Sequence, residues 1–155
     1  MSLNKAVDAM METPIFAGID PKRLRLLAFM SESRTYRAGE LLFEQGDEGD
    51  SAFVVIEGEA SVLINIAGEK REVAVIGANQ VFGEMAVLCD IPRTAAIGAK
   101  SDLEVLRIDR DAFLKLLSEF PEVSLQVMRF LAARLEATTQ ALGQAQADLK
   151  AQKEA

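Results

Sequence analysis

The most informative segment of the chain is Val81-Phe82-Gly83-Glu84-Met85-Ala86-Val87-Leu88, followed directly by Cys89-Asp90-Ile91-Pro92-Arg93-Thr94-Ala95-Ala96-Ile97. Phe82 is predicted to end a strand, and Gly83 lets the backbone turn and lets another group approach its amide closely. Residues 84–88 suffice for about one helical turn, whose free N–H groups favour an anion. Asp90-Ile91-Pro92 predicts a turn, after which a strand-like run begins.

Arg93 and Glu84 are the two charged residues of this segment that indicate a ligand. Arg93 enters a run of small apolar residues, so its charge requires a partner. A phosphate supplies one through a bidentate contact with the guanidinium. Glu84 would repel a phosphate placed directly on it, but it accepts hydrogen bonds from a neutral hydroxyl such as that of a sugar. The segment therefore suits a sugar phosphate; the alternative is an Arg93–Glu84 salt bridge in a loop without a ligand.

The residues on both sides of this segment predict β-structure. Glycines recur every several residues and separate short apolar runs at residues 41–43, 52–56, 62–66, 73–76 and 103–108. Many short strands with regular turn signals are typical of a sandwich or barrel. Ala67-Gly68-Glu69-Lys70 separates two alternating runs and predicts a hairpin.

The two ends of the chain are predicted to be helical, at residues 1 to about 34 and 109–155, with the β-structure at about 35–108. Asp20 is expected to cap a helix that has Pro21 at its first position. Pro121 opens a final helix to about residue 150. Its apolar positions alternate steps of three and four, which is a heptad seam: Met128, Leu131, Leu135, Thr138, Leu142, Ala145 and Leu149. We expect a partner helix on this seam, and the alternative is packing on the chain's own barrel.

Composition excludes several classes of function. The 155 residues correspond to one domain. With 17 Lys and Arg against 24 Asp and Glu, the net charge of −7 argues against nucleic acid and anionic membranes as partners. The absence of histidine and the single cysteine, Cys89, exclude Cys/His zinc sites, Ser-His-Asp triads and iron–sulfur clusters. We expect a cytoplasmic protein that is not an enzyme, without metal or cofactor, in which Cys89 is a small apolar filler.

Phe82-Gly83-Glu84-Met85-Ala86 and Pro92-Arg93-Thr94-Ala95 closely resemble the phosphate-binding cassette of cyclic nucleotide-binding domains. We call residues 82–95 the cassette. The glycine pattern upstream, at Arg37-Ala38-Gly39-Glu40, Glu44-Gln45-Gly46-Asp47, Gly49-Asp50 and Glu57-Gly58-Glu59, is also similar to that family. The resemblance implies an α+β fold: an eight-stranded antiparallel β-roll of jelly-roll type, flanked by N-terminal helices and a long C-terminal helix, with cAMP or cGMP as ligand.

The resemblance also implies roles for single residues. Gly83 and Ala86 would give amides to the phosphate, Glu84 would bind the ribose 2′-hydroxyl, and Arg93 and Thr94 would contact the cyclic phosphate. Some relatives with threonine after the arginine bind cGMP and others bind cAMP, so Thr94 leaves the nucleotide open. One departure is Ala96, where the family often has Thr or Ser. The full set of expected ligand-binding residues is Phe82, Gly83, Glu84, Met85, Ala86, Arg93, Thr94, Ala95, Arg134, Thr138 and Thr139.

The last three of these residues come from the final helix. Ala133-Arg134-Leu135-Glu136-Ala137-Thr138-Thr139 resembles the helix of the bacterial catabolite activator family. By analogy Arg134 would pair with Glu84, while Thr138 and Thr139 would meet the base at a dimer interface, which favours cAMP. That family continues into a helix-turn-helix, which has no counterpart within the 155 residues, so we expect a sensor domain without one.

We therefore expect a stand-alone cAMP- or cGMP-binding regulatory protein that forms a homodimer through a C-terminal coiled coil. It would signal to an unidentified protein partner by a ligand-induced conformational shift. The alternative is a dimeric interaction module of the same fold, with a degenerate pocket or one for another anion. A cupin-type enzyme is a third hypothesis that the sequence disfavours, because such sites usually need histidine ligands and the chain has none.

Overall fold

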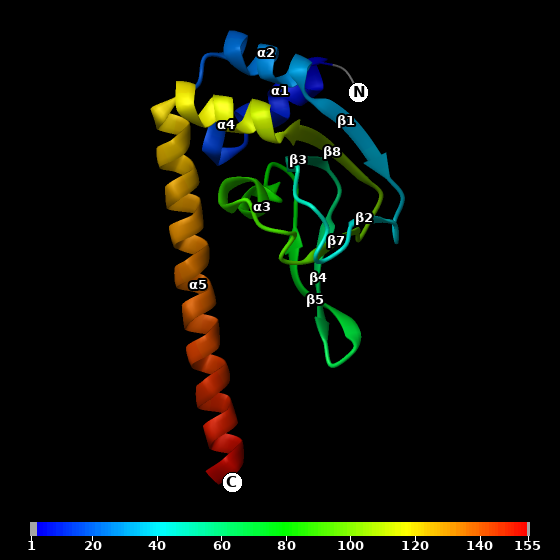
Figure 1. The fold of residues 1–155 in the computed structure, drawn as a ribbon, viewed down its shortest axis with the longest axis vertical. Helices are drawn as coiled ribbons and strands as arrows, with labels where there is room; N and C mark the ends of the chain where they lie inside the picture. The colour runs from blue at the N-terminus through cyan, green and yellow to red at the C-terminus, as the bar shows by residue number, and fades with distance from the viewer. Residues whose placement is uncertain (1–2, 155) are drawn as a thin grey trace.

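The computed structural model describes residues 3–154 and places helices at both ends of a β-structure (Figure 1). The N-terminal helices are α1 (Leu3–Met11), the short 3-10 helix η1 (Pro14–Phe16) and α2 (Pro21–Met30). The strands are β1 (Glu32–Tyr36), β2 (Leu41–Phe43), β3 (Ser51–Glu57), β4 (Ala60–Ile66), β5 (Glu69–Ile76), β6 (Val81–Phe82), β7 (Ala96–Ala99) and β8 (Leu103–Asp109). Helix α3 (Glu84–Cys89) lies between β6 and β7, and α4 (Arg110–Glu119) and α5 (Pro121–Glu154) follow β8.

The strands form two four-stranded sheets, in the orders β1-β8-β3-β6 and β2-β7-β4-β5. Every strand pair is antiparallel, which confirms the predicted eight-stranded roll. Between the sheets lies an apolar cluster that includes Phe53, Phe82 and Val105. A second cluster, with Phe16 and Phe113, joins the outer side of β3 and β8 to the helices. Strand β3 is therefore buried on both faces and exposes only its last residue.

Short sequence signals account for the boundaries of several elements. Asp20 caps α2 as predicted, since its Oδ1 accepts a hydrogen bond from the Lys22 amide at 2.9 Å. Asp109 caps α4 in the same way through the Ala112 amide. Ala67 and Gly68 both have positive φ, 54° and 86°, which is the backbone of a two-residue hairpin turn between β4 and β5.

The predicted N-terminal helical region is wrong at its C-terminal end, because Glu32–Tyr36 is strand β1. The chain leaves the helix at Ser31, which is already extended, with φ −98° and ψ 164°. Strand β1 pairs with β8 at the edge of its sheet, and its residues are mostly exposed. An edge strand with polar side chains on both faces lacks the apolar alternation that identifies strands in a sequence.

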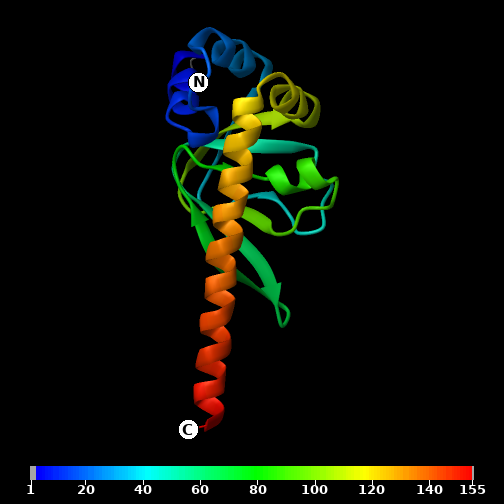
Figure 2. The same ribbon diagram turned by 90° about the vertical axis from the view of Figure 1, so that its left-hand side faces the viewer.

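Helix α5 has two parts with different surroundings (Figure 2). Val123 and Val127 are buried against the domain, whereas every residue from 132 to 154 is exposed. We call residues 132–154 the outer half of α5. Leu135, Leu142 and Leu149 of the predicted seam are 68%, 59% and 52% exposed there. The helix is described as far as Glu154, the last described residue, beyond the predicted end near residue 150. Among residues 3–154 no helix combines the length and apolarity needed to span a bilayer.

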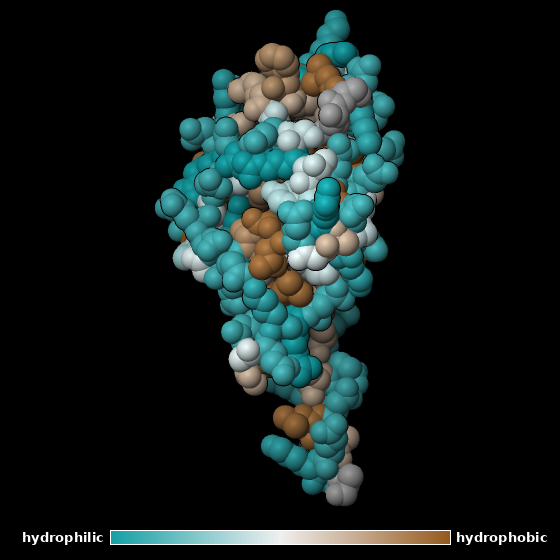
Figure 3. Space-filling model, turned by 90° about the vertical axis from the view of Figure 1, so that its right-hand side faces the viewer, coloured by the Kyte–Doolittle hydropathy of each residue, from teal (hydrophilic) through white to brown (hydrophobic). Residues whose placement is uncertain are grey.

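Apolar residues are also exposed on the second sheet, where Leu41, Val73 and Val75 are 43%, 50% and 38% exposed. Figure 3 shows an apolar patch on this side of the molecule, surrounded by hydrophilic surface.

Candidate functional site

The cassette is built on a sharp backbone turn at Gly83, which has φ +79° and lies between β6 and α3. A Cβ at this position would lie 2.7 Å from Nη1 of Arg93 and 3.2 Å from the carbonyl oxygen of Ser51. Both the left-handed backbone and the close approach therefore require glycine. The sequence predicted this turn and the following short helix correctly.

A second glycine holds α3 close to the rest of the domain. A Cβ on Gly49 would lie 2.1 Å from Cβ of Ala86 and 3.4 Å from the carbonyl oxygen of Ile91. The loop before β3 consequently lies directly against Ala86 of α3. This contact gives a physical reason for a glycine in the upstream pattern.

Arg93 is almost fully buried, with 3% of its side chain exposed. Its Nη1 donates to the Gly83 carbonyl oxygen at 2.9 Å, and its Nη2 donates to Oγ of Ser51 at 3.2 Å. The closest carboxylate oxygen paired with it is Oδ1 of Asp50, at 4.0 Å. Its Nε is buried and has no hydrogen-bond partner within residues 3–154. Burial lowers the pKa of this guanidinium, although charge is still its ordinary state.

The sequence leaves open an Arg93–Glu84 salt bridge in a loop that binds no ligand. This salt bridge is not formed. Glu84, whose side chain is 3% exposed, pairs instead with Arg134 of α5: Nη1 of Arg134 lies 2.7 Å from Oε1 of Glu84. Burial raises the pKa of Glu84, and the positive charge of Arg134 opposes that rise. The expected Arg134–Glu84 pair is thus present, and it ties α5 to the first residue of α3. Figures 1 and 2 show these two helices side by side.

A small network behind Arg93 connects it to the sheet. Ser51 Oγ donates to Oδ1 of Asp50 at 3.0 Å, and Oδ2 of Asp50 lies 3.0 Å from Nη2 of Arg107. Burial is the largest single influence on the pKa of Asp50 and raises it. The hydrogen bond from Ser51 and the positive charge of Arg107 act in the opposite direction, and the net result is a lowered pKa. The guanidinium of Arg93 is therefore anchored to the start of β3.

These side chains surround a cavity of about 60 Å³. Its lining includes nine of the eleven residues predicted for the site, namely Phe82, Gly83, Glu84, Met85, Ala86, Arg93, Thr94, Ala95 and Arg134. Sequence reasoning missed four apolar lining residues, Phe43, Val62, Ile76 and Ile97. They lie on four different strands, β2, β4, β5 and β7, so only the strand register brings them together.

Thr138 and Thr139 do not line the cavity of the single chain. Both are exposed on the outer half of α5, and Oγ1 of Thr139 donates to the carbonyl oxygen of Leu135 at 2.8 Å. The prediction for Cys89 is wrong, because this residue is exposed at the end of α3. Ala96, the departure from the family pattern, is 1% exposed at the start of β7.

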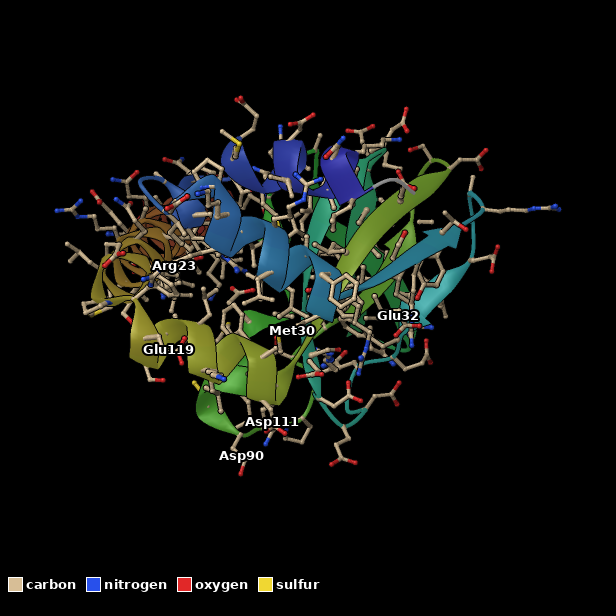
Figure 4. The ribbon with its side chains drawn as sticks, turned by 90° about the horizontal axis from the view of Figure 1, so that it is seen from above. Arg23, Met30, Glu32, Asp90, Asp111 and Glu119 are labelled. Atoms are coloured by element: carbon tan, nitrogen blue, oxygen red, sulfur yellow. The ribbon has the colours of Figure 1, made fainter. Side chains whose placement is uncertain are left out.

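A larger cavity, of about 360 Å³, lies away from the cassette between α2 and α4. Figure 4 shows these helices side by side, with Arg23 and Glu119 near one end and Met30 and Asp111 near the other. Its lining is mainly apolar, and Arg23 covers the ring of Phe120 at 4.9 Å. We place the candidate site at the smaller cavity, because the buried charges and the unpartnered Nε converge there.

Comparison with known proteins identifies the family of this chain. Residues 33–120 match the family described as "Cyclic nucleotide-binding domain". The chain is 32% identical to the cyclic AMP receptor protein of Thermus thermophilus over 124 residues, which cover 79% of this chain and 57% of that protein. It is 34% identical to the cGMP-dependent protein kinase egl-4 of Caenorhabditis briggsae over 119 residues, 75% of this chain and 16% of the kinase.

Solved structures show the same fold. The catabolite activator protein of Thermus thermophilus matches with a TM-score of 0.76 and 30% identity, covering 84% of this chain and 62% of that structure. The chain thus spans little more than half of one curated relative and about a sixth of the other.

Proposed function

The chain belongs to the cyclic nucleotide-binding domain family, and from this membership we propose that it binds cAMP or cGMP at the cassette and regulates another protein in response. The observation that supports this most directly is Arg93: within residues 3–154, its buried guanidinium has no carboxylate in hydrogen-bond contact and carries an unpartnered Nε at a cavity. Such a group attracts a phosphate, because the phosphate supplies both the missing acceptor and the missing negative charge.

We propose the following roles for the remaining cavity residues. Arg93 and Thr94 contact the cyclic phosphate, together with the amides of Gly83 and Ala86. Glu84 accepts a hydrogen bond from the ribose 2′-hydroxyl while it keeps its contact with Arg134. Phe82, Met85 and Ala95 shape the cavity around the sugar. Relatives named for cAMP and for cGMP match at similar identity, so the proposal includes both nucleotides.

Regulation would act through α5, because this helix touches the site through Arg134. The cavity is small, at about 60 Å³, and Arg134 of α5 is part of its lining, so a bound nucleotide contacts this helix. A ligand that contacts both α3 and α5 shifts the equilibrium between two positions of the helix. A coupling on the order of 1–3 kcal/mol is typical of such switches.

We also propose that the outer half of α5 forms a parallel coiled coil with a second copy, in which Thr138 and Thr139 reach the base. The exposed heptad seam supports this, since Leu135, Leu142 and Leu149 lie at its regular spacing. The proposed role is binding rather than catalysis, with the nucleotide as ligand and no metal, and the downstream partner is a protein. A cytoplasmic location remains a prediction from the sequence.

Calorimetric titration with cAMP and cGMP, each to millimolar concentration, tests the proposed ligand. We expect saturable heat with at least one nucleotide, and a loss of roughly tenfold or more in affinity for Arg93→Lys, which keeps the charge but not the bidentate geometry. Circular dichroism of the variant controls for folding. Absence of saturable binding for both nucleotides to the wild-type protein would reject the proposal.

A second candidate is the ligand-independent interaction module. Two observations favour it: the small size of the cavity, about 60 Å³, and the apolar residue Ala96 in place of a hydroxyl. In that case Arg93→Ala would leave the cellular role intact, whereas Leu135→Asp would abolish it. The proposed sensor predicts that both substitutions abolish the role.

A further inference from the structure

Phe43 points into the cavity because of a local irregularity in β2. The pairing of β2 with β7 shifts register between Leu41 and Phe43. In a regular strand these two residues would face the same side. Here Leu41 is exposed, whereas Phe43 packs with the inner cluster and lines the cavity. A bulge of this kind re-aims one side chain, and bulges are frequent next to functional sites.

The ring of Phe43 lies closer to the buried guanidinium than the neighbouring ring of Phe53. Cζ of Arg93 lies over the Phe43 ring at 4.1 Å from its centroid, compared with 5.7 Å for Phe53. The face of an aromatic ring carries partial negative charge and attracts a cation, more strongly when both are removed from water. Burial of the Arg93 cation is otherwise unfavourable, because the carboxylate of Asp50 lies as far as 4.0 Å from it.

The ring of Phe43 is itself held by two other rings. Its centroid lies 6.0 Å from that of Phe53 and 6.3 Å from that of Phe82, in tilted arrangements. Phe53 and Phe82 stack on each other at 4.9 Å with an interplanar angle of 7°. These distances lie in the favourable range for aromatic pairs, so the three rings form a wall of defined position.

An aromatic ring face and a carboxylate differ in whether they occupy the N–H donors of Arg93. A carboxylate placed against Arg93 would occupy its N–H donors and compete with an incoming anion. A ring face offers no hydrogen-bond acceptor of that strength, so the Nη donors keep their bonds to Gly83 and Ser51, and Nε remains without a partner in the described part of the chain.

We infer that Phe43 is a positioning residue: the attraction between its ring face and the Arg93 guanidinium holds the buried cation in place, although the paired carboxylate of Asp50 lies 4.0 Å away, and leaves its Nε without a partner among residues 3–154, so that a phosphate can bind it. The attraction exists in the ligand-free protein, whereas its consequence for nucleotide affinity rests on the proposed function. The two parts are therefore measured separately.

The test replaces Phe43 by mono-, di- and trifluorinated phenylalanines, which weaken the charge of the ring face with little change in size. In the ligand-free protein we expect the unfolding midpoint to fall stepwise along the series, and the ¹⁵N shift of the Arg93 Nε to change with it. On an Arg93→Leu background the midpoint should be independent of fluorination. Nucleotide affinity of the otherwise wild-type series should fall by roughly tenfold in total.

Phe43→Leu and Phe43→Trp complete the design. Leucine keeps an apolar side chain but has no ring, so affinity should fall, whereas tryptophan offers the strongest ring face and should restore part of it. If the midpoint, the Nε shift and the affinity stay constant along the fluorinated series, the ring acts by size alone and the inference is wrong. If the wild-type protein binds neither nucleotide, the proposed function fails, while the ligand-free midpoints on the two backgrounds still decide whether the ring holds Arg93.

Discussion

The cassette and the outer half of α5 both carry residues that the sequence singled out, but only the cassette is complete within one chain. Arg93 and Glu84 each expose only 3% of their side chains and are held in contacts with their own chain. Thr138 and Thr139, by contrast, lie on a helix whose residues from 132 to 154 are all exposed. The first region is built by the fold of one chain, whereas the second is an exposed helical surface.

This difference predicts how each region responds to substitution. In the cassette, backbone atoms touch and charges are desolvated, so small changes in volume or charge are felt directly. In the outer half of α5, side chains project into solvent, and substitutions act on helix propensity or on association rather than on the domain core. Four substitutions, taken in order of expected effect, test this division.

The largest effect is expected for Gly49→Ala. The new Cβ would lie 2.1 Å from Cβ of Ala86, so α3 or the loop before β3 has to move. We expect the free energy of unfolding to fall by about 3 kcal/mol, at the upper end for overpacked sites, together with loss of nucleotide binding. Denaturant unfolding and calorimetry measure the two effects.

Gly18→Ala is the matched control for Gly49→Ala. Gly18 has φ +85°, and a Cβ added there would meet no atom of residues 3–154 within 4 Å. Alanine therefore introduces backbone strain of about 1–2 kcal/mol without a clash, and nucleotide affinity should be unchanged. Equal destabilisation by both substitutions would show that the loop and α3 can separate without loss of packing.

The second effect concerns the outer half of α5, through Leu135→Asp. Leu135 is 68% exposed, so the free energy of unfolding of the single chain should change by less than about 0.5 kcal/mol. A carboxylate in the proposed seam should weaken self-association by roughly 100-fold or more, because a buried unpaired charge opposes it. Sedimentation equilibrium measures the dissociation constant.

Ala133→Asp introduces the same charge outside the seam, two positions before Leu135, and serves as the control. It should leave self-association nearly unchanged. If both variants associate like the wild-type protein, the seam is not the interface, and the outer half of α5 is left without its proposed second copy.

The sequence predicts the cassette well because its residues are local. Gly83, Glu84, Ala86 and Arg93 lie within about a dozen positions of one another, and turn, helix and strand signals place them without knowledge of the rest of the chain. The eight strands likewise follow once the glycine spacing and the family resemblance are combined. Nine of the eleven predicted residues consequently line one cavity.

The parts that the sequence does not predict depend on contacts between distant segments. Phe43 enters the site only because β2 shifts register against β7, and a one-residue shift cannot be seen in a strand of three residues. The predicted helical region extends into strand β1 because the exposed residues Glu32–Tyr36 have no apolar face. Cys89 does not fill an apolar space, since it is exposed at the end of α3, on which Glu84, Ala86 and Val87 are the buried residues.

The third effect tests the ion pair that joins the two regions, through Arg134→Gln. Burial raises the pKa of Glu84 above its ordinary value, and Arg134 limits this rise. A carboxyl whose pKa is raised in the folded state stabilises that state below its unfolded pKa, and this contribution is lost as pH rises through the folded pKa. Arg134→Gln should therefore raise the pKa further and lower stability at neutral pH by about 1 kcal/mol, because half-exposed pairs are screened by solvent.

Unfolding midpoints of the wild-type protein and of Arg134→Gln between pH 4 and pH 8 check this sign. The difference between the two proteins should shrink as the pH falls toward the unfolded pKa of Glu84, near 4.5. Adding Glu84→Gln should remove the pH dependence of the difference. A difference that grows toward acid pH would mean that Glu84 is ionised more easily in the folded state, which contradicts a pKa raised by burial.

The smallest effect, that of Gly143→Ala, asks whether the outer half of α5 unfolds with the domain or by itself. A Cβ on Gly143 would meet no atom of residues 3–154 within 4 Å, and alanine favours a helix interior over glycine by about 1 kcal/mol. Because every residue from 132 to 154 is exposed in the single chain, this gain should appear locally and not in the global free energy of unfolding. Amide hydrogen exchange near residue 143 should then slow by roughly fivefold, while the denaturant midpoint of the domain stays constant.

An equal rise of about 1 kcal/mol in the global free energy of unfolding would mean instead that the outer half is held by the domain or by a second copy during unfolding. Repeating the measurement with Leu135→Asp separates these two cases, since only a contribution from a second copy disappears when association is weakened.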